Sequence, residues 1–382
     1  MSEIKFTESS LEVAIIERLN DLGYDYAIDT DQWCLSRPLD SFINEELLLD
    51  RLSVINKGVK TSVLEQAIKS LKNLDNPSLF ERNHIVHKWL TDGIQVEDYE
   101  SDVNPLVRFI DFVNLDNNVY QVANQLKFKE NRNVRIPDVI LFVNGIPLVI
   151  FELKSIEYSE DTFIERAYEQ LGRNGEADGY RFDIPTLFNY NALLVISDGA
   201  NNRVGTLTSD ITRYSEWKSV DGEMGYKKDY AYKLDVLLEG LLKPARLLDV
   251  IKNDLFFMNK DKEKPVKIIA QYHQYFGVQK AYDSIKNHLK PNGDGKAGII
   301  WHTQGSGKSF SMVMLAYKLI IDKEMNNPTI VVLTDRNDLD EQLYTTFSSA
   351  AEFLRTRPPS MQATRKIRKQ ARELTSRANL WG

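Results

Sequence analysis

"RIPDVILFVNGIPLVIFELKS" (residues 135–155) predicts the central element of the first domain. Two apolar runs flank Asn144-Gly145, a dipeptide typical of tight β-hairpin turns. Both runs are apolar throughout rather than alternating, which predicts strands buried on both faces of a sheet. Charges are costly on such strands, yet Asp138 stands at one end of the hairpin and Glu152 and Lys154 at the other. These three residues therefore need either partners or a function.

The pairing register of the hairpin decides whether these charges meet. Alternate residues of a strand share a face, so Glu152 and Lys154 project to the same side. A two-residue turn would set Asp138 opposite Phe151, whereas a three-residue loop or a bulge would set it opposite Glu152. We therefore predict a bulge or an odd-length loop near residues 144–146. Paired in this way, the carboxylates would form an oxygen site for Mg²⁺, and Lys154 would orient a water or stabilise a phosphate. The alternative is a surface salt bridge.

Composition bounds the class of protein. The chain has 382 residues, 42% hydrophobic and 27% charged, which suits two or three globular domains. A formal net charge of -7 argues against a uniformly basic DNA-binding protein but leaves room for a local basic groove. The single cysteine, Cys34, excludes a disulfide framework and favours a reducing compartment. No signal-peptide pattern and no apolar run of about 20 residues is present, so we expect a soluble cytoplasmic protein without a membrane segment.

The pattern along the chain changes near residue 260. Before it, helices are predicted near 8–23 and 161–174, and strands near 105–113, 118–128, 135–153 and 191–199, which together indicate an α/β layer over residues 1–258. Residues 259–267 are charged and apolar-poor and form the predicted linker. In the second domain, 268–382, helices are predicted over 272–289 and 309–323 and strands over 297–302 and 328–334, the βαβ order of a parallel sheet. The basic tail from Arg355 is either a solvated surface helix or a nucleic-acid contact.

A phosphate-binding loop stands between the first predicted strand and helix of the second domain. "HTQGSGKS" (302–309) matches the P-loop pattern except that His302 replaces its first glycine. Glycines let backbone amides surround a phosphate, Lys308 would reach the β- and γ-phosphates of ATP, and Ser309 would bind Mg²⁺. The predicted ATP-binding residues of the loop are Thr303, Gln304, Gly305, Ser306, Gly307, Lys308 and Ser309. Upstream, Gln274 would hydrogen-bond an adenine edge, unless it is an ordinary surface glutamine.

The hairpin carries a second recognisable pattern. Pro137-Asp138 followed by Glu152-Leu153-Lys154 resembles the PD-(D/E)xK signature of a nuclease superfamily. Such nucleases often add a glutamate on an upstream helix, and Glu12 matches that position, although Ser9-x-x-Glu12 is also a capping box. The RecB-like branch adds Gln-x-x-x-Tyr on the following helix. Gln170 fits the glutamine, but Asn174 stands where the tyrosine belongs.

A nuclease hairpin, a charged linker and a helicase-type P-loop, in that order, resemble the R (restriction and motor) subunit of type I restriction–modification enzymes. The resemblance extends to about residue 350 and includes "NHIVHKWLTDGIQVED", "FNYNALLVISDG", "QYHQYFGVQKA" and "LTDRNDLDEQL". It implies a PD-(D/E)xK nuclease domain with a mixed sheet, followed by part of a RecA-like motor domain. It also implies methyltransferase and specificity subunits as partners, ATP-driven translocation of double-stranded DNA, and Mg²⁺-dependent cleavage.

Two departures from this family leave other readings open. By this resemblance the chain stops before the acidic Asp-Glu-x-x motif of the motor, so we expect this chain alone to hydrolyse ATP poorly. Family members are also much longer. One alternative is a stand-alone nuclease–helicase of DNA repair or antiphage defence. The other is a catalytically silent ATP- or DNA-binding module, in which Asp138, Glu152 and Lys154 form structural ion pairs.

Overall fold

The structure is a computed structural model, which describes residues 7–76, 78–98, 103–155, 159–173, 176–223, 233–259, 265–332 and 337–355. Contacts divide the chain into two compact units: unit 1 comprises residues 1–255 and 266–280, and unit 2 comprises 256–265 and 281–382. The predicted linker, 259–267, lies where the chain passes from one unit to the other and back. The domain boundaries 258 and 268 stay a prediction. Most of that linker and the basic tail beyond Arg355 lie outside the described residues.

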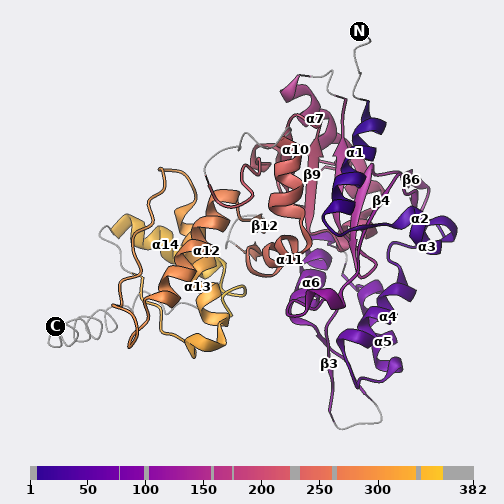
Figure 1. The fold of residues 1–382 in the computed structure, drawn as a ribbon. Coiled ribbons are helices and arrows are strands. Elements are labelled where there is room, and N and C mark those ends of the chain that lie inside the picture. The colour runs from indigo at the N-terminus through magenta and orange to yellow at the C-terminus, as the bar shows by residue number, and fades with distance from the viewer. Residues whose placement is uncertain are drawn as a thin grey trace. The chain divides into compact units, whose positions relative to one another are not determined.

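A mixed sheet forms the centre of unit 1 (Figure 1). Among the described residues it has the strand order β1-β4-β7-β8-β9-β10. The pairs β1/β4 and β8/β9 are parallel, and the pairs β4/β7, β7/β8 and β9/β10 are antiparallel. The strands are β1 (Asp25–Tyr26), β4 (Tyr120–Asn124), β7 (Val139–Val143), β8 (Ile146–Leu153), β9 (Leu193–Ser197) and β10 (Asn202–Gly205). Every residue of β7, β8 and β9 is buried, as their unbroken apolar sequences predict.

The β7–β8 hairpin has a bulge, but not where we predict it. Asn144 and Gly145 both have positive φ, +53° and +78°, and form a tight two-residue turn. The turn pairs Val143 with Ile146, and the register then shifts between Leu141 and Phe142, so that Val139 pairs with Phe151. The bulge is therefore on β8 beyond the turn. Its consequence is the predicted one, because continuing this register by one step sets Asp138 opposite Glu152.

Helices of unit 1 cover the sheet and extend beyond it. Helix α1 contacts β1, β4 and β8, and α7 contacts β8 and β9. Helices α4 and α5 pack on each other, away from α7 (Figure 1). The helices are α1 (Glu8–Asp21), α2 (Ala27–Thr30), α3 (Gln32–Ser36), α4 (Glu45–Ile55), α5 (Thr61–Lys72), α6 (Leu79–Asp92), α7 (Glu160–Leu171), α8 (Gly179–Asp183), α9 (Pro185–Asn189), α10 (Lys233–Leu237) and α11 (Pro244–Asn253), with short η1 (Leu115–Asn117), η2 (Ile211–Arg213) and η3 (Leu238–Leu242).

Shorter strands complete the first unit. Two antiparallel pairs lie apart from the main sheet, β2 (Ile94–Gln95) with β3 (Leu106–Val107), and β5 (Phe128–Glu130) with β6 (Asn133–Arg135). The strand predicted over 105–113 is thus only two residues long, since Arg108–Val113 turns away from strand geometry. Strand β11 (Leu255–Met258), which belongs to unit 2 except for Leu255, ends just before the predicted linker, and β12 (Val266–Ile269), in unit 1, begins within the linker's last two residues. Helix α12 (Tyr272–Asn287) spans the predicted range.

Unit 2 contains the predicted P-loop helix but not the predicted strands. It has α13 (Lys308–Ile321), η4 (Lys323–Met325) and α14 (Asn337–Ser349). Phe353 stacks on both Phe256 and Tyr317, with ring centroids 4.6 and 3.9 Å away. Residues 297–302 and 328–332 are not strands, which corrects the sequence prediction. Ile299 and Trp301 are 95% and 83% exposed, and no described strand hydrogen-bonds beside them, whereas parallel-sheet strands need neighbours and cover on both faces.

Within the part of the chain that the structure describes, no helix is both long and apolar enough to cross a bilayer.

Candidate active site

Asp138 lies just before β7, at the edge of the hairpin predicted to carry the chemistry. Its Oδ2 accepts a hydrogen bond of 2.7 Å from the Leu153 backbone N–H, across the hairpin. Its Oδ1 accepts a longer one, 3.4 Å, from Gln125 Nε2. These bonds fix the carboxylate beside the last residues of β8. The hairpin register therefore brings Asp138 to Glu152, as the sequence analysis requires.

Glu152 and Lys154 lie together at the end of β8. The Glu152 side chain is completely buried, and Lys154 Nζ donates to its Oε1 over 2.5 Å. The same ammonium donates to the Leu153 carbonyl and to Gln170 Oε1, each over 2.9 Å. Glu152 Oε2 is also buried, and no group among the described residues hydrogen-bonds to it. The two side chains thus form a buried hydrogen-bonded pair with one carboxyl oxygen left over, not the surface salt bridge of the alternative reading.

The electrostatics of the two acids reflect their burial and their closeness. Burial, together with the neighbouring Asp138 carboxylate, raises the pKa of Glu152 to about 8, against the opposing effect of Lys154. Burial likewise raises the pKa of Asp138 to about 6, while the Leu153 N–H and Lys154 lower it. Each acid holds its proton at a pH where an exposed carboxylate is ionised. Strongly perturbed acids that lie close together are typical of functional sites.

Glu12 reaches this site from α1. Its Oε2 accepts from Asn124 Nδ2 (2.8 Å) and its Oε1 from Gln125 Nε2 (2.9 Å), the same amide that reaches Asp138. The capping-box alternative is wrong, because the N-cap of α1 is Thr7, whose hydroxyl accepts from the Ser10 N–H. Glu12 therefore stands in the second turn, on the helix face that covers β4 and β8. The sequence analysis missed Gln125, whose position after β4 gives no distinctive signal.

Gln170 lies on α7, and its partner is a tyrosine that the sequence spacing did not identify. Its Oε1 accepts from Lys154, and its Nε2 donates to the Tyr180 hydroxyl over 2.6 Å. That hydroxyl donates to the Ile136 carbonyl (3.2 Å), on the approach to Asp138. Tyr180 comes from α8, ten residues after Gln170. The structure thus supplies from α8 a tyrosine for the glutamine whose expected partner position holds Asn174, itself outside the described residues.

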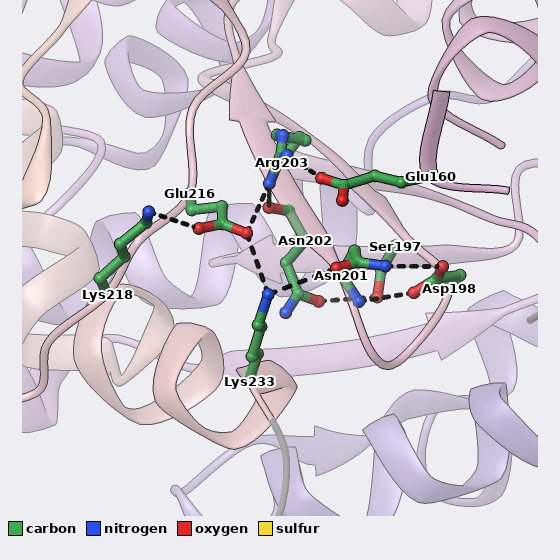
Figure 2. A network of polar contacts seen from close by, with 9 residues as sticks. All are labelled: Glu160, Ser197, Asp198, Asn201, Asn202, Arg203, Glu216, Lys218 and Lys233. Atoms are coloured by element: carbon green, nitrogen blue, oxygen red, sulfur yellow. Dashed lines mark hydrogen bonds and ion pairs between the residues drawn. The ribbon is translucent and has the colours of Figure 1, made fainter. Parts of the chain in front are cut away.

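An ion-pair network fixes the beginning of α7 (Figure 2). Arg203 of β10 lies between two carboxylates: it pairs with Glu160 in the first turn of α7 and with Glu216, the latter over 2.7 Å. The Nζ atoms of Lys218 and Lys233 also form ion pairs with the Glu216 carboxylate, over 2.8 and 3.3 Å. Hydrogen bonds from these cations outweigh the effect of burial and lower the pKa of Glu216 to about 2. The network ties α7, and with it Gln170, to the edge of the sheet.

A groove of about 820 Å³ opens beside these residues. Side chains of α1, α7 and α8 line it, together with residues of β6 and the residue after β8. Glu8, one turn before Glu12 on α1, is in its wall, and its Oε1 accepts from the Ser155 N–H (3.2 Å). The i, i+4 spacing of the two glutamates was the signal for Glu8 that the sequence analysis left unused. The remaining wall is formed by Val134, Arg135, Ile136, Lys154, Arg166, Glu169, Gln170, Gly179 and Tyr180.

The acids fit a hard divalent cation by their chemistry. Oε2 of Glu152 is buried and has no hydrogen-bond partner among the described residues, and the carboxyl groups of Asp138 and Glu152 both have raised pKa values. A cation bound there would offset the cost that burial imposes on their charges. The donors number only two side chains. In the described part of the chain, no cluster of three or more His, Cys, Asp or Glu side chains has the geometry of a metal site.

The P-loop keeps its turn geometry in unit 2. Gly305 and Gly307 adopt φ values of +81° and +74°, a region that favours glycine, and α13 begins at Lys308. Lys308 Nζ donates to the carbonyls of His302 and Thr303, over 3.1 and 2.8 Å, and so lies across the loop. The glycines, the lysine and the helix start therefore occupy the places that the sequence pattern predicts.

Gln274 is not a surface glutamine. It is only 4% exposed, and its Oε1 accepts from the Gln271 N–H at the start of α12. It belongs to unit 1, whereas the P-loop belongs to unit 2. Its predicted contact with adenine stays a prediction.

Comparison with known proteins identifies the family. The family model "Type I restriction enzyme R protein N terminus" matches residues 5–213, and the "SWI2/SNF2 ATPase" model matches 273–379. The type I restriction enzyme HindI endonuclease subunit of Haemophilus influenzae is 37% identical over 94% of this chain and 34% of its own length. The putative type I restriction enzyme MjaIXP endonuclease subunit of Methanocaldococcus jannaschii is 34% identical over 89% of this chain and 34% of its own.

The chain spans about a third of the length of these relatives. The matched N-terminal region, residues 5–213, contains the candidate-site residues from Glu8 to Tyr180. The chain therefore belongs to the family of type I restriction enzyme R proteins, of which it carries the N-terminal region.

Proposed function

We propose that this chain is the nuclease part of the restriction subunit of a type I restriction–modification system, and that it cuts double-stranded DNA with Mg²⁺. The observation that carries the proposal is the juxtaposition of Asp138 with Glu152 and Lys154 across a bulged hairpin. The names of the relatives, which are type I restriction endonuclease subunits, support the same role. By this reading the methyltransferase and specificity subunits choose the DNA site.

Each residue has a defined task in this mechanism. Asp138 and the free Oε2 of Glu152 provide the oxygen ligands. Mg²⁺ bound there would supply charge to the scissile phosphate and lower the pKa of an attacking water. Lys154 orients that water and stabilises the extra negative charge on the phosphate, held in place by Gln170. The burial of Glu152 keeps competing water away from its ligand oxygen.

Plasmid cleavage by the assembled complex tests the nuclease assignment. The methyltransferase and specificity subunits are combined with the full-length restriction subunit carrying Asp138→Asn or Lys154→Ala. We expect each variant to lose about 10²-fold or more in cleavage rate while ATP hydrolysis is retained. Asp116→Asn, an exposed aspartate beyond the groove, is the matched control. Undiminished cleavage by both site variants would refute the proposal and favour the catalytically silent module, with the buried Glu152–Lys154 pair as a structural element.

We further propose that Gly305, Gly307 and Lys308 bind the phosphates of ATP, with Ser309 at the associated Mg²⁺, as part of a DNA-translocating motor. The glycine geometry and the helix start at Lys308 support this. Binding of a fluorescent ATP analogue to the 382-residue chain is the test. Lys308→Ala is expected to weaken binding by about tenfold or more, whereas Lys323→Ala in η4 leaves it unchanged. Equal affinities of the two variants for the ATP analogue would refute the proposal that Lys308 binds the phosphates of ATP.

Cleavage without partner subunits separates the main alternative. A stand-alone nuclease–helicase would cut DNA in the absence of methyltransferase and specificity subunits. We expect that only the assembled complex cuts DNA. A full-length restriction subunit that degrades plasmid DNA by itself would instead favour a repair or antiphage nuclease.

A further inference from the structure

The β5–β6 hairpin is a two-faced ribbon attached to the active site. It pairs only with itself among the described strands, with Phe128 opposite Arg135 and Lys129 opposite Val134. Directly opposed residues of an antiparallel pair share a face, and faces alternate along each strand. One face therefore carries Phe128 and Arg135, and the other carries Lys129 and Val134.

The first face anchors the ribbon to unit 1. Phe128 is fully buried. Glu130 accepts from the Thr186 N–H and from its hydroxyl, over 2.9 and 2.8 Å, and Arg135 Nε donates to Asp183 over 2.6 Å. Apolar burial and charge-assisted hydrogen bonds thus hold the ribbon in one position on α8 and α9. It is a rigid platform rather than a free loop.

The second face and the residues next to it are basic and open to solvent. Lys129 lies on that face, Lys127 directly precedes β5, and Arg132 is in the turn of the ribbon. All three are exposed, and Val134 is 43% exposed. Within the described part of the chain, none of the three cationic side chains has an ion pair or a hydrogen bond. The one acid of the ribbon, Glu130, is on the anchored face. Three unpaired positive charges in so short a segment contrast with the chain's net charge of -7.

The ribbon also borders the catalytic groove. It begins after Gln125, which hydrogen-bonds Glu12 and Asp138, and it leads through Ile136 directly to Asp138. Val134, Arg135 and Ile136 line the same groove as Lys154. A ligand held on the ribbon is therefore held beside the groove that Lys154 lines.

We propose that the basic face of the β5–β6 hairpin binds the phosphate backbone of duplex DNA and holds it against the catalytic groove. The inference rests on the proposed nuclease function and names the element that grips its substrate. Unpaired cations on a rigid element suit phosphate contacts, and a two-stranded ribbon has the width of the DNA major groove. An acidic protein partner is the competing occupant, but an exposed face with Val134 as its only large apolar side chain offers such a partner little to bury.

Salt-dependent DNA binding by the 382-residue chain tests the proposal. A fluorescent duplex of about 30 base pairs is titrated without Mg²⁺ at about 50 to 300 mM KCl, and the logarithm of the association constant is plotted against that of the salt concentration. For the triple variant Lys127→Gln, Lys129→Gln, Arg132→Gln we expect the slope to flatten by about 2.7, and affinity near 0.1 M salt to fall on the order of 10²-fold. Lys129→Gln alone is expected to flatten the slope by about 0.9.

A matched triple variant controls for lost charge. Lys57, Lys69 and Lys243 are equally exposed, lie in unit 1, and have no side-chain ion pair among the described residues. Their replacement by Gln is expected to leave the slope nearly unchanged. Equal losses in the two triples would overturn the proposal, as would a wild-type chain that binds no duplex. So would a ribbon triple that keeps its DNA affinity and loses binding of polyglutamate, because that result assigns the face to an acidic protein.

The outcome is separable from that of the nuclease proposal. If Asp138 proves dispensable for cleavage while binding depends on the ribbon, the nuclease assignment fails and the ribbon stands. If cleavage needs Asp138 but the ribbon triple variant binds and cuts DNA normally, only the proposal that the ribbon binds DNA is refuted.

Discussion

Replacing Glu152 by Gln is expected to change how the stability of unit 1 depends on pH. Burial raises the pKa of Glu152 from its ordinary 4.5 to about 8. Between these values the folded state binds a proton that the unfolded state releases, so the free energy of unfolding falls as pH rises. One such proton contributes a slope of about 1.4 kcal/mol per pH unit, and hence about 2 to 3 kcal/mol between about pH 5.5 and 7.5. Gln does not titrate, so this contribution to the slope disappears.

Urea unfolding followed by tryptophan fluorescence measures the difference. Of the five tryptophans, Trp301 and Trp381 lie in unit 2, and replacing both by Phe leaves a signal from unit 1 alone. The free energy of unfolding is compared at several pH values for Glu152, Glu152→Gln and the exposed control Glu65→Gln. Parallel pH profiles for wild type and Glu152→Gln would refute the reasoning, because they would mean that Glu152 ionises in the folded state as it does in the unfolded chain.

The same variants test the metal proposal without any cleavage assay. A cation bound between Asp138 and Glu152 replaces the proton, so about 10 mM Mg²⁺ at pH 7.5 should stabilise the wild type and remove most of its pH slope. Glu152→Gln should gain much less from Mg²⁺. An equal gain for both proteins would place any Mg²⁺ effect elsewhere in the chain.

Three further predictions concern the supports of the site. Tyr180→Phe removes the hydroxyl that holds Gln170 and should slow plasmid cleavage about 5- to 10-fold, with no additional loss when Gln170→Ala is combined with it. Glu216, whose pKa is about 2, contributes stability above pH 4.5 that is lost as pH falls toward 2, so Glu216→Gln should cost about 1 to 2 kcal/mol at pH 7 and little near pH 2, as measured by urea unfolding. Gly145→Ala should destabilise unit 1 by about 1 to 3 kcal/mol in the same assay, because φ is +78° and the new Cβ would lie 2.7 Å from the Asn44 carbonyl oxygen.

How much of the site the sequence predicts depends on how local each contact is. Asp138, Glu152 and Lys154 could be found because the hairpin that joins them is short and its turn residues are explicit. Even so, the position of the bulge could not be read, since the Asn144-Gly145 turn is the regular two-residue type and the shift occurs farther along β8. The sequence indicates that a register shift is required to bring Asp138 opposite Glu152, but it does not indicate at which residue of β8 the shift occurs.

Contacts between distant elements were harder to foresee. From the sequence, Glu12 could belong either to a capping box or to the active site, because both roles use a glutamate near the start of a helix. The N-cap at Thr7 decides between the two roles. The Gln-x-x-x-Tyr pattern does not point to Tyr180, because it places the glutamine and the tyrosine about one turn apart on the same helix. In the fold the two residues come from α7 and α8, with Gly172 at positive φ after α7 and Gly179 at positive φ as the first residue of α8. What matters for the chemistry is the hydroxyl on the Gln170 amide, and more than one backbone path can deliver it.

Unit 2 shows the same division between local and non-local information. The turn of the P-loop is set by the φ preferences of Gly305 and Gly307 and by the helix that follows, so it forms where the pattern predicts. The flanking segments have the apolar, β-branched composition of parallel strands, but a strand exists only with a hydrogen-bonded neighbour. Among the described residues neither segment has one, and Ile299 and Trp301 remain exposed. Composition encodes the tendency to pair, and pairing itself requires a partner strand.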